Sequence, residues 1–408
     1  MEYETLTGLS VEESRKRLTD NISVSCSDVM VPLEEAWGRI ISKDIIAREP
    51  VPDFERSAMD GYAVMSRDVS LAGSESPVQL KVTGEVFAGD DSKAAAAAGT
   101  ALRVMTGAMI PEGFDAVIRQ EDTDCGEDTV RIFAGAVPGK NICPVGENIK
   151  KGEKVLKKGD RIGRMEIGLL SSMGISKVPV KSPVRAGIIS TGDELTAVGK
   201  DRGPAGIYGN ISYMLSASVR AAGFEVSCDR ICPDDAKIIK EEIRCALAVS
   251  DVVITTGGVS VGKKDLIPEV LDSLGAETLF YGSDIKPGAP TRGSVLDGKV
   301  ILSLSGNPYA ALVNFDLYFW DVAAGLTGSS YYETRTHKAI LLDSYEKRND
   351  CRRFLRARFD GEQVSLSGGA DRSSVIGDMA GCNCYVDVPA GKTYTAGDIV
   401  DIVLMQFM

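Results

Sequence analysis

The chain has 408 residues, of which 44% are hydrophobic and 25% are charged. This is ordinary globular composition, with room for roughly two to four domains. The net charge of -12 excludes nucleic acid as the main partner, because binding to phosphates relies on clustered lysine and arginine. An anionic substrate would need a locally basic pocket.

The compartment is indicated by the N-terminus and by the cysteines. The opening MEYETLTGLSVEESRKRL carries acids where a signal peptide needs a basic region. No stretch approaches the roughly 18 consecutive apolar residues of a membrane span. The nine cysteines lack the spacing of a disulfide framework, which favours reduced thiols. We therefore expect a cytoplasmic protein without a membrane partner.

The first part of the chain predicts a helix and then a mainly β domain. Ser10 and Glu13 in SVEE form a capping box at a helix start. From Pro50 to about Asn148, short runs such as VQLKVTGEVF and DAVIRQED are broken by Gly, Pro and Asp, as in β structure. Lysines crowd residues 150–163, which is typical of a solvated surface, and GRMEIGLLSSMG predicts a short helix.

The middle of the chain alternates between strands and helices. VRAGIIST, FEVSCDRI, DVVITTGG and VILSLSG read as strands, and NISYMLSASVRAAG, AKIIKEEIRCALAVS, DLIPEVLDSLG and PYAALVNFDLYFW read as helices. The strands are continuous apolar runs, as expected when both faces of a sheet are covered. This pattern predicts a doubly wound α/β domain. From Gly328 onward, runs such as CRRFLRARF and DIVDIVLMQF predict a small C-terminal β domain or barrel.

Candidate chemistry follows the strands of the α/β region, because ligands of open α/β sheets bind beyond the carboxyl ends of the strands. Four such segments hold unusual polar residues: TGDEL with Asp193 and Glu194, TGGVSVGKKD with Asp265, KPGAP with Lys286, and SGNP with Asn307 and Pro308.

These segments predict a site for an anion and a metal. Asn307 followed by Pro308 fits an N-cap and a first helical position, and a helix N-terminus favours phosphate or another oxyanion. Asp193, Glu194 and Asp265 supply hard oxygens of the kind that hold Mg²⁺ together with a substrate phosphate. Each acid taken singly fits a cap or a turn equally well, and it is the convergence of four segments that favours a site.

Other machinery is poorly supported. GGVSVGKK nearly matches a Walker A loop, but Lys264 stands where Ser or Thr would bind Mg²⁺, so we interpret it as a glycine loop for close backbone approach. The lone His337 makes a catalytic triad or a histidine-rich metal site improbable. The cysteine pairs CDRIC and CNC lack the usual zinc spacing and fit structural thiols.

Asp60, in RSAMDGYAV, has two interpretations. Asp-Gly is a strong signal for a tight turn, in which both residues tolerate positive φ. A functional carboxylate is the alternative, and the residues alone do not decide between the two.

The motifs together are recognisable. PVPDFERSAMDGYAV, RVMTGAMIPEGFDAVIRQED, STGDEL, DVVITTGGVSVGKKD and LSGNP occur in the order found in one family. The chain resembles the MoeA molybdopterin molybdenumtransferases, which are relatives of the gephyrin E domain and its plant counterpart. The similarity runs nearly end to end. The α/β segment by itself also resembles MogA and MoaB, which are molybdopterin-binding and adenylylating proteins.

The resemblance implies a fold and an activity. The expected domains are an elongated linker domain from 1–47 with 147–180, a mainly β domain at 48–146, a MogA-like α/β domain at 181–328 and a small β-barrel domain at 329–408. The implied reaction inserts molybdate into adenylyl-molybdopterin with Mg²⁺, releases AMP and forms molybdenum cofactor. The implied assembly is a homodimer whose active site is shared between subunits, with transient contact to other proteins that make the cofactor.

The resemblance also assigns site residues. Asp60, Thr106, Glu194, Asp265 and Lys286 match catalytic positions, with Asp60 presented from the partner subunit. Asp193, Glu194 and Asp265 are the expected Mg²⁺ ligands. The expected molybdopterin-binding residues are Thr191, Gly192, Asp193, Gly257, Gly258, Ser260, Gly262, Pro287, Gly288, Ser305, Gly306, Asn307, Pro308 and Ser373.

The chain departs from the family pattern at four positions. Asn148 replaces an acid, Gly282 and Ala289 stand where lysines are common, and Ser305 replaces the proline of LPGNP. Either Lys263, Lys264 or Arg292 compensates for the missing lysines, or the chain is a paralogue that handles another oxyanion such as tungstate. A non-catalytic molybdopterin-binding or scaffold protein and a molybdopterin-adenylylating enzyme are the remaining alternatives.

Overall fold

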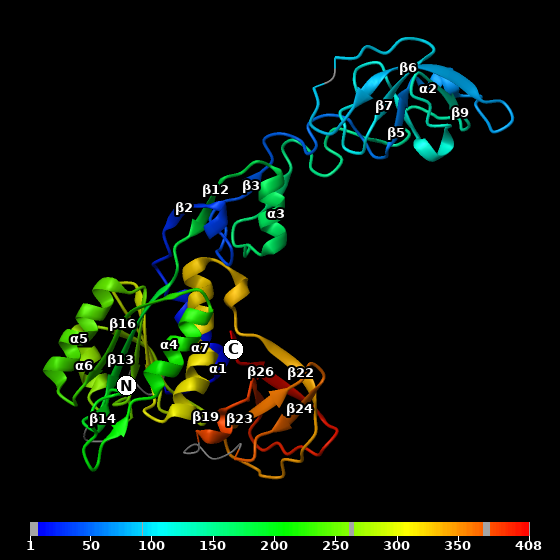
Figure 1. The fold of residues 1–408 in the computed structure, drawn as a ribbon. Coiled ribbons are helices and arrows are strands. Elements are labelled where there is room, and N and C mark those ends of the chain that lie inside the picture. The colour runs from blue at the N-terminus through cyan, green and yellow to red at the C-terminus, as the bar shows by residue number, and fades with distance from the viewer. Residues whose placement is uncertain (1–6, 92, 261–264, 370–375, 408) are drawn as a thin grey trace. The chain divides into compact units, whose positions relative to one another are not determined.

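The computed structural model describes residues 7–91, 93–260, 265–369 and 376–407 (Figure 1). The chain divides into two compact units. The first comprises residues 1–43, 158–164 and 177–408, and the second comprises residues 44–157 and 165–176. No helix in the described part of the chain combines the length and the apolarity needed to cross a membrane.

A seven-stranded mixed sheet organises the first unit. In spatial order its strands are β1 (Thr7–Leu9), β18 (Glu277–Ser283), β20 (Arg292–Leu296), β21 (Lys299–Leu304), β17 (Val252–Thr256), β13 (Arg185–Thr191) and β16 (Glu225–Cys232). The strands from β21 to β16 pair in parallel, whereas β20 is antiparallel to both of its neighbours. This sheet, with its covering helices, has the α/β form that the sequence predicts.

Helices cover both faces of this sheet (Figure 1). One face packs against α1 (Val11–Asp20), α4 (Ile211–Ala221) and α7 (Pro308–Thr327), and the other against α5 (Ala236–Val249) and α6 (Ile267–Leu274). Successive residues of a strand pack into the two cores alternately. Ile188 lies in the core with α7, and its neighbour Ile189 lies in the core with α5. This alternation explains why the strands read as continuous apolar runs.

The N-terminal segment belongs to this sheet. The sequence assigns residues 1–47 to a linker domain, but β1 pairs with β18 and α1 packs against α7. The predicted cap is present, since Ser10 accepts a hydrogen bond from Glu13 N–H at 3.1 Å. Val11 and Leu18 are buried in the α7 core. The helix pattern gives the buried face but not its partner, which explains the difference.

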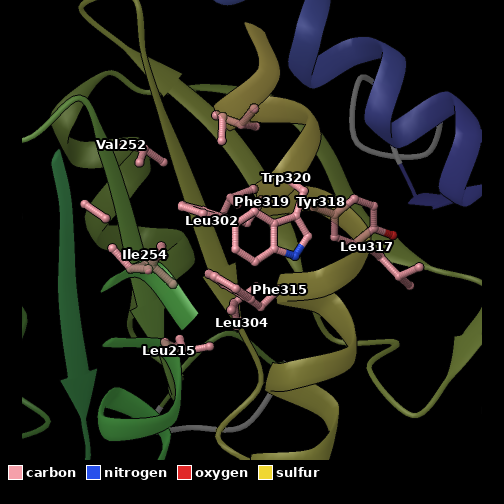
Figure 2. Close-up of a cluster of buried hydrophobic side chains, with 14 of the residues drawn as sticks. Leu215, Val252, Ile254, Leu302, Leu304, Phe315, Leu317, Tyr318, Phe319 and Trp320 are labelled. Atoms are coloured by element: carbon pink, nitrogen blue, oxygen red, sulfur yellow. The ribbon is translucent and has the colours of Figure 1, made fainter. Parts of the chain in front are cut away.

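The aromatic half of α7 forms the centre of the larger core (Figure 2). Phe315 and Phe319 stack with ring centroids 4.4 Å apart, and Trp320 contacts both rings edge-on. These rings pack toward apolar residues of the central strands, including Ile254 and Leu302. This helix is buried nearly all round, as its sequence indicates.

The C-terminal barrel is built from β22 (Thr336–Leu341), β23 (Arg352–Phe359), β24 (Gln363–Leu366), β25 (Cys384–Val388) and β26 (Ile399–Leu404). Pairing of β23 with β25 closes the barrel. The short strand β19 (Ile285–Lys286) leaves the α/β domain and pairs in parallel with β23. The remaining strands of the first unit are β2 (Asp28–Pro32) with β12 (Lys177–Lys181), and β14 (Leu195–Thr196) with β15 (Ile207–Tyr208).

The second unit is mainly β. Its five-stranded sheet runs β8 (Ala116–Arg119), β5 (Gly61–Val64), β7 (Thr100–Val104), β6 (Val78–Val86) and β9 (Thr129–Ile132). Two short ladders, β3 (Ile45–Ile46) with β11 (Lys154–Leu156) and β4 (Arg56–Ser57) with β10 (Ile142–Cys143), and helices α2 (Ser66–Val69) and α3 (Arg164–Ser172) complete it. The linker assignment of residues 147–180 spreads over both units, since β12 belongs to the first and α3 almost wholly to the second.

A buried acid joins α7 to the barrel. Asp316 accepts hydrogen bonds from Trp320 Nε1 at 3.0 Å and from the Tyr385 hydroxyl at 2.8 Å. Burial raises the pKa of the Asp316 carboxyl from 3.8 to about 7, because a charge in an apolar surrounding is poorly solvated. The folded protein therefore binds a proton that the unfolded chain has already released between these two pH values.

We predict that Asp316 makes the protein less stable as the pH rises from about 4 to about 8. The proton-linked stability is complete below pH 3.8 and is lost as the pH rises through about 7. The neutral variant Asp316→Asn lacks this contribution. Urea unfolding measures the difference between the free energies of unfolding of Asp316→Asn and of the wild type. This difference should shift in favour of the variant as the pH rises, by up to roughly 4 kcal/mol. Parallel stability curves would contradict the prediction.

Candidate active site

The loops that follow β13, β17 and β21 meet around one pocket of about 820 Å³. Its location at the carboxyl ends of parallel strands is where open α/β sheets bind ligands. The predicted site residues that line it are Thr191, Gly192, Glu194, Gly257, Gly258, Ser260, Asp265, Ser305, Gly306, Asn307 and Pro308. Gly262 and Ser373 were also predicted, and both lie outside the described residues, as do Lys263 and Lys264.

The glycine loop permits close backbone packing. Gly257 and Gly258 have φ angles of +87° and +60°, which side chains other than glycine rarely adopt. A Cβ on Gly257 would lie 2.5 Å from the Thr191 carbonyl oxygen, and a Cβ on Gly306 would lie 3.3 Å from the Gly257 Cα. The three loops therefore touch through their backbones. The Tyr281 hydroxyl lies 3.1 Å from the Val259 carbonyl oxygen and 3.2 Å from that of Ser260, and donates to both.

The N-terminus of α7 has the predicted cap. Asn307 Oδ1 accepts a hydrogen bond from Ala310 N–H at 3.1 Å, and Pro308 takes the first helical position. Ser305, where the resemblance leads us to expect proline, accepts the Asn307 N–H through its hydroxyl at 3.2 Å. Ser305 also lines the pocket.

Of the three predicted metal ligands, two line the pocket and one does not. Glu194 and Asp265 line the pocket, whereas Asp193 is outside its lining and accepts a hydrogen bond from Asp234 N–H at 3.1 Å. The described residues contain no group of three His, Cys, Asp or Glu side chains that could hold a metal ion. Mg²⁺ is commonly held by one or two carboxylates plus substrate phosphate, so Glu194 and Asp265 fit that ion while Asp193 serves a turn.

Lys286 lies in a second pocket of about 430 Å³, which shares Pro290 and Asn307 with the first. Pro287 and Gly288 also line it. Lys286 on β19 is the register partner of Arg353 on β23, and both residues line this pocket. Two like charges on adjacent strands repel, and an anion between them would relieve that repulsion.

Sequence reasoning missed Arg353. Its side chain is only 3% exposed, and its guanidinium donates to Asn349 Oδ1 at 2.7 Å. The only signal was an arginine on the predicted strand CRRFLRARF, and that pattern did not show which strand would lie beside Lys286. Arg353 is thus a buried cationic residue in the lining of the second pocket, and its guanidinium also donates to the Tyr345 hydroxyl.

The proposed compensation by Arg292 does not occur. Arg292 is fully buried outside both pockets and donates to Asp272, Thr278 and Ser294. Gly282 has a φ of +77°, so a lysine at this position would be strained. Ala289 is exposed and lines the second pocket, where a lysine would be accommodated more easily.

Asp60 and Thr106 come together in the second unit. Asp60 Oδ1 accepts hydrogen bonds from Thr106 N–H at 2.7 Å and from the Thr106 hydroxyl at 2.8 Å. These bonds, the backbone one first, lower the pKa of the exposed Asp60 carboxyl. The carboxylate is thus held in place just before β5. Asn148 lies in the same unit, where its N–H donates to the Val51 carbonyl.

His337 and the cysteines of CDRIC and CNC lie outside both pockets, whereas Cys351 lines the second one. His337 is an exposed residue of β22, and its ring lies 5.7 Å from that of Phe359. Cys232, Cys382 and Cys384 are buried and Cys228 is half-buried, as expected of structural thiols. Burial raises the pKa of Cys232 to about 11 and that of Cys384 to about 12.

Three protein-family models match the chain in order. They are "MoeA N-terminal region (domain I and II)" over residues 9–174, "Probable molybdopterin binding domain" over residues 187–323 and "MoeA C-terminal region (domain IV)" over residues 338–405. All residues that line the two pockets lie within the stretches that the second and third models match.

Full-length relatives agree. Molybdopterin molybdenumtransferases of Staphylococcus epidermidis and Staphylococcus aureus are each 33% identical over 410 residues, covering 100% of this chain and 98% of theirs. The crystal structure of the molybdopterin biosynthesis MoeA protein from Pyrococcus horikoshii superposes with a TM-score of 0.86 at 30% identity, covering 98% of this chain and 100% of that one.

Fold and site together define a multidomain α/β and β protein with a pocket at the carboxyl ends of its parallel strands. The chain belongs to the MoeA family. The predicted family and fold class are thereby confirmed.

We predict that Gly257→Ala is far more damaging than Gly275→Ala. Both glycines have positive φ, but only at Gly257 would a Cβ collide with backbone, whereas Gly275 has nothing within 4 Å. Gly275→Ala should cost about 1–2 kcal/mol of unfolding free energy for the left-handed backbone alone. Gly257→Ala should cost roughly 1–3 kcal/mol more, because the loops must move apart. Equal losses in urea titrations would disprove backbone contact between the loops.

Proposed function

We propose that the chain is a molybdopterin molybdenumtransferase that inserts molybdate into adenylyl-molybdopterin, with Mg²⁺, to form molybdenum cofactor and release AMP. The observation that carries the proposal is the pair of adjoining pockets. One gathers the glycine loop, the α7 N-terminus and three acidic residues, Glu194, Asp234 and Asp265, and the other is lined by Lys286 and Arg353. The full-length relatives named above carry that activity in their names.

The larger pocket suits the phosphate-bearing ligand. Gly257 and Gly258 let the backbone approach the ligand closely, and the capped N-terminus of α7 attracts negative charge. Its volume is in the range of a small-molecule site. Glu194 and Asp265 would hold Mg²⁺, which supplies positive charge that offsets the phosphates.

The smaller pocket suits the oxyanion. Lys286 and Arg353 lie in register and offset the charge of molybdate next to an anionic pterin. Two unit charges 4 Å apart repel by about 4 kcal/mol at an effective dielectric of 20, so uncompensated anions would not assemble. The dithiolene sulfurs of the substrate provide the nucleophiles, which leaves positioning and charge compensation to the chain.

Asp60 and Thr106 are proposed to complete the site from the partner subunit of a homodimer. They lie in the second compact unit, whereas both pockets lie in the first. The fixed orientation of the Asp60 carboxylate supports a role in presenting a charge, and it agrees with the turn interpretation as well.

The missing lysines favour two alternatives. The oxyanion could be tungstate, or the protein could bind molybdopterin without catalysing a reaction. Arg353 weakens the case for lost function. It is a positively charged residue in the lining of the pocket, and the lysines expected at positions 282 and 289 are missing.

We predict that purified protein given adenylyl-molybdopterin, Mg²⁺ and molybdate releases AMP. Tungstate should be tested in parallel, because Lys286 and Arg353 recognise charge rather than the metal. Chromatographic measurement of AMP distinguishes the alternatives. Release with tungstate alone identifies the paralogue, and tight pterin binding without release under either oxyanion identifies a binding protein.

We predict that Asp60→Ala abolishes this release while the protein stays folded. The matched control is Asp360→Ala, since Asp360 is also exposed and also accepts two hydrogen bonds, from Glu362 N–H and Gln363 N–H. The control should keep wild-type turnover. A fully active Asp60→Ala variant would show that Asp60 has a structural role in the turn and no role in catalysis.

The shared site is tested by mixing two inactive variants. Asp60→Ala and Glu194→Ala alter different compact units. If each site combines residues of both subunits, co-refolded mixtures should recover about a quarter of wild-type AMP release, because half the dimers carry one intact site of two. No recovery, with dimers seen by light scattering, would place both residues in the same subunit's site.

A further inference from the structure

The lining of the larger pocket includes exposed apolar residues that the proposed chemistry does not use. Ile207 is 51% exposed, Tyr208 is 46% exposed and Ile376 is 37% exposed, and all three line this pocket. Ile207 and Tyr208 form β15, and Ile376 belongs to the C-terminal domain. Polar residues of the same pocket come from the loops after β13, β17 and β21, and also include Asn210 before α4 and Asp234 after β16. The lining therefore combines exposed apolar side chains with a polar anion-binding end.

Tyr208 is held in place by its own loop. Its hydroxyl donates to the Lys200 carbonyl at 3.3 Å, and the Arg202 guanidinium lies 5.6 Å from the ring centroid. The strand itself is anchored to the polar end, since Ile207 N–H donates to the Glu194 carbonyl at 2.8 Å. The ring is therefore a fixed surface at a set position relative to Glu194, and such preorganised aromatic surfaces bind flat ligands at low entropic cost.

We propose that Tyr208, with Ile207 and Ile376, binds the planar nitrogen heterocycle of a phosphate-bearing ligand, whose phosphate occupies the polar end. Exposed aromatic and aliphatic side chains lose water when a flat ring covers them, and stacking on an aromatic ring is tolerant of ring chemistry. Adenine and pterin share this chemistry. The choice of adenine and pterin as candidate rings rests on the proposed function. The inference adds a ring-binding residue, Tyr208, to the site proposed for that function.

The test compares two ligands that differ only by the ring. AMP and ribose 5-phosphate share the sugar phosphate, and only AMP carries a base. Isothermal titration calorimetry of the full-length protein with Mg²⁺ should show that Tyr208→Ala weakens AMP binding about tenfold or more and changes ribose 5-phosphate binding less than about twofold. Pterin is titrated in parallel, because a loss confined to pterin assigns Tyr208 to the pterin ring instead of to adenine.

Two further variants separate the ring from its surroundings. Tyr208→Phe keeps the ring and loses only the bond to Lys200 that helps to hold it, so it should lose much less affinity than Tyr208→Ala. Tyr213→Ala removes a tyrosine of similar exposure, 50%, on α4 outside the pocket lining, and it should have no effect. If Tyr208→Phe loses as much affinity as Tyr208→Ala, the hydroxyl rather than the ring is responsible and the proposal is overturned.

The remaining outcomes are also decisive. Unchanged binding of both AMP and pterin by Tyr208→Ala, or failure of the wild type to bind either ring, overturns the proposal. Neither result bears on catalysis, which is measured as AMP release from adenylyl-molybdopterin. A protein that binds AMP through Tyr208 without releasing it from that substrate would keep the ring site and lose the transferase function.

Discussion

Direct backbone contact between the loops at the carboxyl ends of three parallel strands is the constraint on which the site depends. Gly257 packs against the Thr191 carbonyl, and Gly306 packs against Gly257. No side chain fits between them, so these backbone contacts set how closely the loops carrying Thr191 and Asn307 approach each other. A preorganised site lowers the entropic cost of assembling several anions.

Local signals in the sequence predicted much of the fold and of the larger pocket. Apolar strands, the SVEE cap, the Asn307–Pro308 helix start and the glycine loop each depend on neighbouring residues, and each has the predicted form. The sequence did not show which distant segments pack against one another. Nothing near Val11 or Leu18 indicates that their helix packs on α7, and nothing near Arg353 indicates that β23 lies beside Lys286. Asp193 and Glu194 are adjacent in sequence, yet only Glu194 lines the pocket, because a backbone N–H of Asp234 engages the other acid.

The second pocket bears on Gly282 and Ala289, where the resemblance to the family leads us to expect lysines. At Gly282 the backbone has positive φ, which a lysine would adopt only under strain. Arg353 provides charge from another strand. Charge near an anion acts mainly through distance, so a cation from β23 can replace one from the segment before β19.

The barrel is consequently part of the site. β19 carries Lys286 from the α/β domain onto the edge of β23, where it pairs with Arg353. Two further contacts fix the same boundary. The Tyr309 hydroxyl, one residue into α7, accepts from Arg356 N–H of β23, and Asp316 accepts from Tyr385 of β25. Because α7 begins at the anion-binding end and continues into these contacts, a displacement of the barrel would move the α7 N-terminus and Lys286 together. The two pockets share Asn307 for the same reason, since this residue caps α7 between them.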